Sequence, residues 1–158
     1  MEIYRITRLK YLENFSGRGG SFFHGARWNN AGLPVLYFAT SSSLALLEMA
    51  NYIPNPRLVP ADYRLGIYHL PDSILSESLS PSELPDDWSE YPYPQSTQKI
   101  GSEWLLSQRS SILFVPSVAV PGGLENIAVI NPQHPEIEQL KLVSTETNLY
   151  NNRMFDGI

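Results

Sequence analysis

Residues 25–48 predict a polar loop, a short strand and a helix in direct succession. Their sequence is GARWNNAGLPVLYFATSSSLALLE. Turn-forming residues fill the first part of this run. The aliphatic and aromatic residues of 35–39 then predict a strand, and 40–43 offer N-caps for a helix over 44–52. Because these three elements follow one another without long linkers, they can pack together, and the rest of the chain has to be arranged around them.

Three polar side chains of different type come from these three elements. Arg27 lies in the loop, Tyr37 in the strand, and Glu48 is the one carboxylate in the apolar run 44–50. Such a combination is typical of an active site, although each residue also has a structural interpretation. Glu48 could be a buried carboxylate with a basic partner, Tyr37 a core residue of the sheet, and Arg27 part of a surface cation–π pair with Trp28.

The remaining sequence predicts one α+β domain over residues 1–158, with a mostly β centre. Alternation over 2–8 indicates a first strand with Tyr4 and Ile6 on one face and Arg5 on the other. A helix is expected over 96–107, although Gly101 weakens that prediction. Further strands are expected at 63–70, 111–120 with a break at Pro116-Ser117, 124–131 and 137–143. Residues 14–25 are predicted to form a glycine-rich loop, and 71–95 an irregular surface excursion with one helical turn around Ile74 and Leu75.

Several classes of protein are disfavoured by what the sequence lacks. It contains no GxxxxGK[ST], GxGxxG, HExxH or GxSxG motif, and its histidines lack metal-ligand spacing, so no metal site is expected. The absence of cysteine excludes disulfides and thiolate nucleophiles and is compatible with a reducing cytoplasm, the location we expect. A net charge of −5 argues against direct nucleic-acid binding. No apolar run approaches the ~20 residues of a membrane span, and the N-terminus does not resemble a signal peptide.

Charge is unevenly distributed along the chain. Residues 1–33 are predominantly basic, whereas 72–90 contain acidic residues and no basic ones. The N-terminal part could therefore receive an anionic small molecule. The acidic part could face a basic partner or solvent, or its acidic side chains could simply be distributed over the surface without a function.

Five segments of the sequence resemble the RES-domain family, the toxin half of bacterial toxin–antitoxin pairs, named for its Arg, Glu and Ser. The matching segments are YRI at 4–6, GARWNNAGLPVLYFATSSSLALLE at 25–48, IGSEWL at 100–105, VPSVAVPGGLENIAVINPQHP at 115–135 and YNNRM at 150–154. The last differs from the family's usual signature, with Asn152 in place of proline and Met154 in place of leucine. The matches run in order from one end of the chain to the other.

The resemblance implies a fold related to ADP-ribosyltransferases and a site that binds NAD⁺ as substrate, without a metal. The family's Arg, Glu and Ser correspond to Arg27, Glu48 and Ser117, with Tyr37 as a further site position. Arg5 and Asn126 match two other pocket positions. The resemblance also implies a partner, a small Xre-like helix-turn-helix antitoxin that carries the DNA contact, forms an oligomer with the toxin and blocks the pocket with its C-terminal segment.

Residue chemistry gives each site residue an expected role. Glu48 would stabilise the cationic, oxocarbenium-like state formed when the nicotinamide–ribose bond breaks. Arg27 would hold the pyrophosphate or a ribose hydroxyl, Tyr37 would stack on nicotinamide, and Ser117 would bind ribose or the carboxamide. The expected function is a toxin that depletes NAD⁺ by hydrolysis or phosphorolysis. Two alternatives are a mono-ADP-ribosyltransferase and a binding module without catalysis, the latter opposed by the presence of all four residues.

Overall fold

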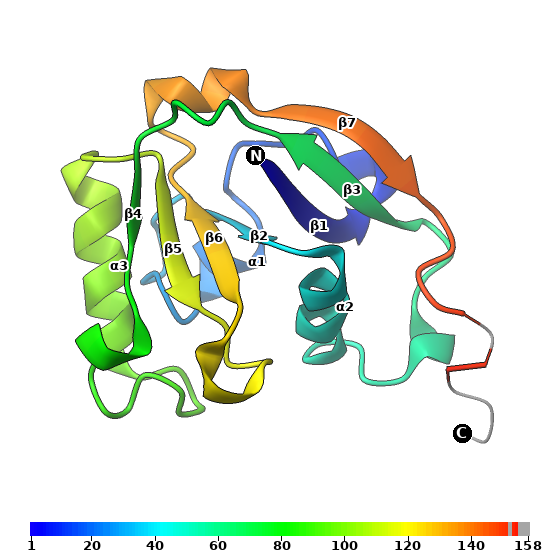
Figure 1. The fold of residues 1–158 in the computed structure, drawn as a ribbon, viewed down its shortest axis with the longest axis horizontal. Helices are drawn as coiled ribbons and strands as arrows, with labels where there is room; N and C mark the ends of the chain where they lie inside the picture. Colours follow the sequence, from blue (N-terminus) through cyan, green and yellow to red (C-terminus); the bar gives the residue numbers. More distant parts are fainter. Residues whose placement is uncertain (152, 155–158) are drawn as a thin grey trace.

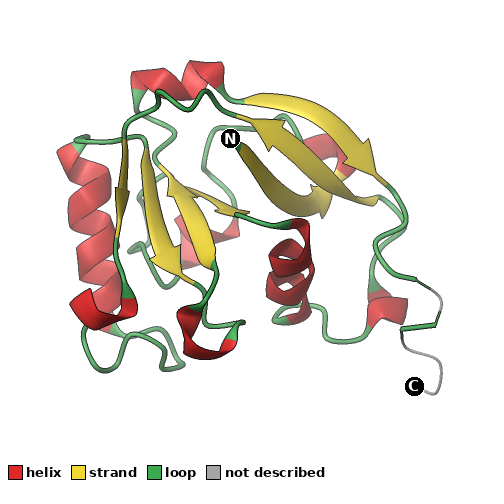
Figure 2. Ribbon diagram, viewed as in Figure 1, coloured by secondary structure: helices red, strands yellow, loops and turns green. Residues whose placement is uncertain are grey.

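Seven strands among the described residues form one mixed sheet in the order β4-β5-β6-β2-β1-β3-β7. The computed structural model describes residues 1–151, 153 and 154, so Asn152 of the YNNRM segment lies outside the described residues. The strands are β1 (Glu2–Arg8), β2 (Leu36–Ala39), β3 (Tyr63–His69), β4 (Ser76–Ser78), β5 (Ile112–Pro116), β6 (Asn126–Ile130) and β7 (Lys141–Glu146). The helices are α1 (Gly20–His24), α2 (Ser42–Ala50) and α3 (Gln95–Ser107), with short 3-10 turns between elements (Figure 2).

The sheet consists of two parts that are joined at one narrow point. β1 pairs with β3 along its whole length, but its pairing with β2 is confined to Tyr4 opposite Ala39. β4 and β5 are parallel, and the other neighbours are antiparallel. Figure 1 shows β1, β3 and β7 running at an angle to β4, β5 and β6, with α2 near the junction of the two groups. The sheet is therefore strongly bent where β1 meets β2.

Alternating side chains of the strands build two hydrophobic cores, one on each face of the sheet, because successive residues of a strand point to opposite faces. The first core includes Ile3, Phe38, Tyr68, Ile112 and Ile130. The second includes Ala39, Leu44, Trp104, Val115 and Val129, and so takes in α2 and α3. Tyr4 and Ile6 pack against the second core, which leaves Arg5 on the face of the first, as the alternation predicts.

Most predicted elements are confirmed. The first strand, the 35–39 strand and the 63–70 strand are present as β1, β2 and β3. The helix predicted over 44–52 is α2, and its N-cap is Ser41, whose side chain accepts a hydrogen bond from the Leu44 N–H. The predicted 96–107 helix is α3. The strand predicted at 137–143 begins only at Lys141, because a 3-10 turn that starts with Pro135 continues to Gln139.

Two predictions about irregular regions are wrong. Residues 14–25 are not entirely loop, since they contain the short helix α1. Residues 71–95 are not only a surface excursion, because β4 lies within them and pairs with β5. The helical turn expected around Ile74 and Leu75 is one hydrogen-bonded turn, in which the Ile74 N–H donates to the Pro71 carbonyl at 3.3 Å. The later part of this segment, 85–94, reaches the candidate site.

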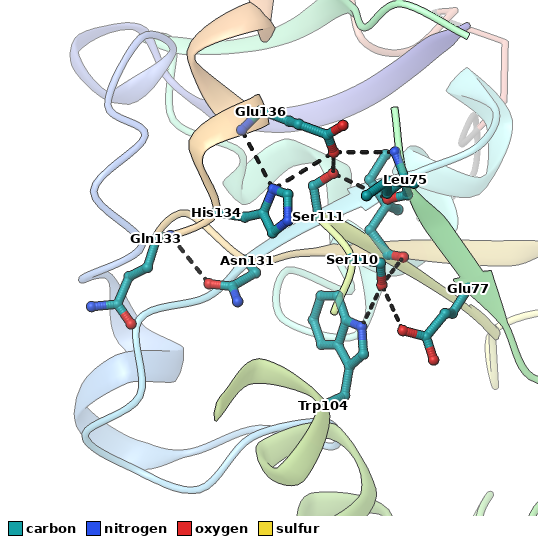
Figure 3. A network of polar contacts seen from close by, with 10 residues as sticks. Leu75, Glu77, Trp104, Ser110, Ser111, Asn131, Gln133, His134 and Glu136 are labelled. Carbon is teal, nitrogen blue, oxygen red and sulfur yellow. Dashed lines mark hydrogen bonds and ion pairs between the residues drawn. The ribbon is translucent and has the colours of Figure 1, made fainter. Parts of the chain in front are cut away.

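A polar network fixes the end of β5 that is remote from Ser117 (Figure 3). Trp104 Nε1 donates to Ser110 Oγ at 2.8 Å, and Ser110 Oγ donates to Glu77 Oε1 at 2.8 Å. The neighbouring Ser111 Oγ donates to Glu136 Oε2 at 2.5 Å. The network ties α3 and β4 to the start of β5.

No helix in the described part of the chain is long and apolar enough to cross a bilayer.

Candidate active site

A cavity of about 880 Å³ lies on the second-core face of the sheet and is lined by residues from many parts of the chain. β1, β2, α1, α2, segment 85–94 and the loop after β5 all contribute to its wall. Five of the six predicted site residues line it: Arg5, Arg27, Tyr37, Glu48 and Ser117. A second cavity of about 500 Å³, between residues 56–63 and 147–151, contains none of the predicted residues.

Glu48 is the acidic group of the cavity, and two donors hold its carboxylate. Ser117 Oγ donates to Oε1 at 2.6 Å, and Asn51 Nδ2 donates to Oε2 at 3.2 Å. Ser117 is 1% exposed, and its Oγ also accepts the Ala119 N–H at 3.0 Å. Because the one hydroxyl proton of Ser117 is committed to Glu48, the serine orients the carboxylate.

Glu125 connects the loop that carries Ser117 to the start of the helix that carries Glu48. Its backbone carbonyl accepts the Ser117 N–H at 2.8 Å, and its carboxylate Oε2 accepts Ser41 Oγ at 2.6 Å. Ser41 is the N-cap of α2. The buried neighbours Leu44 and Ala45 fix the rotation of the helix about its axis. Both partners of the Glu48–Ser117 bond are therefore positioned by the fold.

Arg27 reaches across the cavity to the backbone of segment 85–94. Its Nη1 donates to the Trp88 carbonyl at 2.5 Å and to the Glu90 carbonyl at 2.8 Å. Its guanidinium carbon lies 5.2 Å from the ring centroid of Tyr93. Burial lowers the pKa of Arg27, while Tyr93 and Glu48 act to raise it. Among the described residues, Nε and Nη2 form no hydrogen bond, so these two donors can face a ligand.

Helix α3 holds the loop that carries Arg27. A side chain at Gly101 would place its Cβ 2.0 Å from the Trp28 carbonyl oxygen, so the helix approaches the loop this closely only because residue 101 is glycine. Gln98 Nε2 donates to the Ala26 carbonyl at 3.2 Å, and Ser102 Oγ accepts the Asn30 N–H at 2.9 Å. The IGSEWL segment thus supports the site from outside the cavity.

Tyr37 is anchored through its hydroxyl. This hydroxyl donates to Asn29 Oδ1 at 2.7 Å and accepts the Trp28 N–H at 3.3 Å. Burial raises the pKa of Tyr37 well above its ordinary value, so the phenol stays neutral throughout the physiological range. The hydroxyl is engaged by the protein, and what Tyr37 offers the cavity is its ring.

The other two predicted site residues, Arg5 and Asn126, are not grouped with Arg27, Glu48 and Ser117. Arg5 contributes to the cavity wall, but its guanidinium lies 5.8 Å from the Phe38 ring, on the first-core face. Burial lowers the pKa of Arg5, and its Nη1 is buried with no hydrogen-bond partner among the described residues. Asn126 is exposed and is absent from the cavity wall, although its carbonyl accepts bonds from Thr40. Their roles as pocket residues stay predictions.

Sequence reasoning missed several residues of the site. Asn51 and Tyr52 follow Glu48 by three and four positions, and this helical spacing could have drawn attention to them. Tyr91 and Tyr93 also line the cavity, from a segment interpreted as surface. The carbonyls that Arg27 binds have no signature in the sequence. Among the described residues, no group of three or more His, Asp or Glu side chains is placed to hold a metal ion.

The chain is similar to known proteins over most of its length. The chain is 39% identical over 133 residues to "Toxin Res" of Photorhabdus laumondii, covering 84% of this chain and 82% of that protein. It is 35% identical over 150 residues to "Prs ADP-ribosylating toxin" of a Sphingobium species, covering 94% and 91%. The fold is similar to the M. tuberculosis MbcT–MbcA toxin–antitoxin complex, with a TM-score of 0.71 at 24% identity, covering 92% of this chain and 82% of that one. The sequence model of the RES domain matches residues 2–151, and the chain belongs to the RES-domain family.

Proposed function

We propose that this protein is the toxin of a toxin–antitoxin pair and that it cleaves the nicotinamide–ribose bond of NAD⁺. The observation that carries the proposal is the 2.6 Å bond between Ser117 Oγ and Glu48 Oε1 in a cavity that also holds Arg27. A cavity of about 880 Å³ is large enough for a dinucleotide. Similar proteins named as toxins, one of them ADP-ribosylating, support the same reaction class.

Glu48 supplies what this bond cleavage requires of a protein. Nicotinamide leaves with the bonding electron pair and becomes neutral, while positive charge develops on the ribose ring. A fixed carboxylate beside that ring stabilises the developing charge, as carboxylates do in glycoside hydrolysis. Ser117 and Asn51 keep the carboxylate in one orientation, so little reorganisation is needed during the reaction.

Arg27 is the group that holds the phosphates. Its Nη1 is committed to two backbone carbonyls, which fixes the plane of the guanidinium. The remaining donors can form charge-assisted bonds with the pyrophosphate. Tyr37 contributes a ring surface, and Ser117, whose hydroxyl is committed to Glu48, acts through the orientation of that carboxylate.

The identity of the acceptor separates two versions of this function. Water or phosphate would give free ADP-ribose or its phosphorylated form and would deplete NAD⁺. A protein side chain would make the enzyme a mono-ADP-ribosyltransferase. The second version is favoured by the Sphingobium relative, whose name describes an ADP-ribosylating toxin.

A toxin of this kind needs an antitoxin, and we propose a small Xre-like helix-turn-helix protein. The similar solved fold belongs to a toxin–antitoxin complex. Arg27 at the cavity offers a carboxylate of the partner's C-terminal segment a bidentate donor. With a net charge of −5 on this chain, the DNA contact belongs to the partner.

The direct test is NAD⁺ consumption by purified protein, with and without phosphate, beside Glu48→Gln. The matched control is Glu103→Gln, which changes an exposed carboxylate on α3 away from the cavity. We expect nicotinamide release by the wild type and the control, and loss on the order of 10²–10³ in rate for Glu48→Gln.

The products identify the acceptor. Free ADP-ribose indicates water, and a phosphorylated ADP-ribose indicates phosphate. Little free product but labelled protein after incubation of cell extract with labelled NAD⁺ indicates the transferase. NAD⁺ that stays intact in all of these mixtures, with no labelled protein, contradicts the proposed function.

A further inference from the structure

Three tyrosines from two separate segments meet at the mouth of the cavity. Tyr52 follows α2, and Tyr91 and Tyr93 belong to segment 85–94; all three line the cavity. The Tyr52 and Tyr93 hydroxyls are 3.5 Å apart. The rings of Tyr91 and Tyr93 pack edge to face, with centroids 5.5 Å apart. Tyr93, which also lies under the Arg27 guanidinium, is therefore the centre of the cluster.

The two outer rings of this cluster are largely uncovered. Tyr52 is 72% exposed and Tyr91 is 80% exposed, whereas Tyr93 is only partly exposed. Two exposed aromatic rings beside a large cavity present flat faces that a ligand can cover. The bonds of Arg27 to the Trp88 and Glu90 carbonyls hold segment 85–94, and with it Tyr91, at the cavity.

Tyr52 lies just beyond the end of α2, about one turn after Glu48. The two are four positions apart, and the Tyr52 N–H donates to the Met49 carbonyl at 3.0 Å, which continues the helical turn. Partial burial of the phenol in the cavity wall, the Tyr93 hydroxyl and the charge of Glu48 all raise the pKa of Tyr52, in agreement with this proximity. Whatever is bonded to the ribose carbon beside Glu48 must therefore come close to Tyr52.

We infer that Tyr52 and Tyr91 form an aromatic wall that binds the nicotinamide ring of NAD⁺, with Tyr93 as the residue that positions them. The inference rests on the proposed function, because it takes Glu48 as the group beside the nicotinamide-bearing ribose carbon. The nicotinamide of NAD⁺ is a planar cation, and electron-rich phenol rings attract such a cation through their π faces. Free nicotinamide is neutral, so the wall holds the substrate more strongly than the product that leaves.

The test is calorimetric binding of NAD⁺ and of ADP-ribose to Glu48→Gln protein, in which turnover is suppressed. Adding Tyr52→Leu or Tyr91→Leu should weaken NAD⁺ binding by roughly tenfold. ADP-ribose lacks the nicotinamide ring, and its affinity should stay unchanged. Phenylalanine at either position keeps the ring and should keep most of the NAD⁺ affinity. Tyr11→Leu, in an exposed turn outside the cavity wall, is the control for loss of a surface tyrosine.

Each contrary outcome has a definite meaning. If both leucine variants bind NAD⁺ as tightly as the parent, the inference is wrong while the proposed function stands. If ADP-ribose binding weakens as much as NAD⁺ binding, the rings contact the adenosine part and the assignment to nicotinamide is wrong. A wild type that does not cleave NAD⁺, together with a parent that does not bind it, overturns the proposed function as well.

Discussion

Ser117 and Glu48 are 69 positions apart in the chain, and their side chains form a 2.6 Å hydrogen bond on the wall of one cavity. The serine hydroxyl donates this bond and accepts another from the Ala119 N–H. The pair joins the loop after β5 to α2, so the orientation of the carboxylate depends on two distant segments being correctly packed.

Replacing Ser117 by alanine should lower the rate of NAD⁺ cleavage while leaving the fold intact. A hydrogen bond to a charged group contributes about 1.5–3 kcal/mol, which corresponds to a loss of roughly 10–100-fold in kcat. Steady-state kinetics with circular dichroism as the check on folding measures this. Ser82→Ala, at an exposed serine that does not line the cavity, should have the wild-type rate. A Ser117→Ala enzyme of undiminished kcat would mean that the serine does not orient Glu48.

Gly101→Ala should destabilise the protein, although alanine is the better helix former by about 1 kcal/mol. The added Cβ would meet the Trp28 carbonyl oxygen at 2.0 Å, so α3 and the Arg27 loop must separate. Overpacking of this kind costs about 1–3 kcal/mol, and thermal unfolding should show a Tm lower by several degrees. Gly20→Ala is the control, because nothing lies within 4 Å of its added Cβ. A raised Tm for Gly101→Ala would contradict the observed packing.

Arg27→Lys should impair substrate binding even though it keeps the positive charge. A lysine ammonium cannot donate to the Trp88 and Glu90 carbonyls and also present a planar pair of donors to phosphate. We expect KM for NAD⁺ to rise by roughly tenfold or more, as for the loss of a hydrogen bond to a charged group. Arg57→Lys, at an exposed arginine outside this cavity, should leave KM unchanged. Equal KM values for wild type and Arg27→Lys would rule out a bidentate role for Arg27.

Glu77 should contribute to stability at neutral pH but not in acid. Arg109, and to a smaller extent Ser110, lower the pKa of Glu77 below its ordinary value of 4.5. Figure 3 shows the bond between the Ser110 hydroxyl and the Glu77 carboxylate. A depressed pKa in the folded state means that the stabilisation is present above that ordinary value and disappears as pH falls through the folded-state pKa. Glu77→Gln should therefore have a lower Tm than wild type at pH 7, and the difference should shrink in acid. Thermal unfolding of both proteins as a function of pH measures this. A Tm difference that grows in acid would contradict the assignment.

Local patterns in the sequence were sufficient to predict most of the fold. The N-cap candidates at 40–43 before an apolar run predict α2, and alternation over residues 2–8 predicts β1 and the side on which Arg5 lies. The α1 helix has only five residues and no hydrophobic period, so a glycine-rich loop was the natural interpretation. β4 has three residues, and its strand geometry comes from pairing with β5, which is distant in sequence.

The candidate site was predicted only in part, because some of its contacts depend on tertiary structure. Arg27, Tyr37, Glu48 and Ser117 were found because the motifs around them resemble a family, and the structure brings all four to one cavity. Gly101 looked like a weakness of α3, whereas it is what allows the helix to contact the Arg27 loop. A contact of that kind depends on tertiary structure and cannot be inferred from helix propensity.

The two bonds from Arg27 to segment 85–94 end on backbone carbonyls. Every amino acid provides such a carbonyl, so the attachment itself does not depend on the side chains at 88 and 90, although the Trp88 ring also packs against the second core. A related protein could therefore exchange the tyrosines of this segment, and with them the surface it offers a ligand, without rebuilding the way the segment is held. Substrate preference could therefore change through substitutions in segment 85–94, a segment that has no recognisable sequence motif.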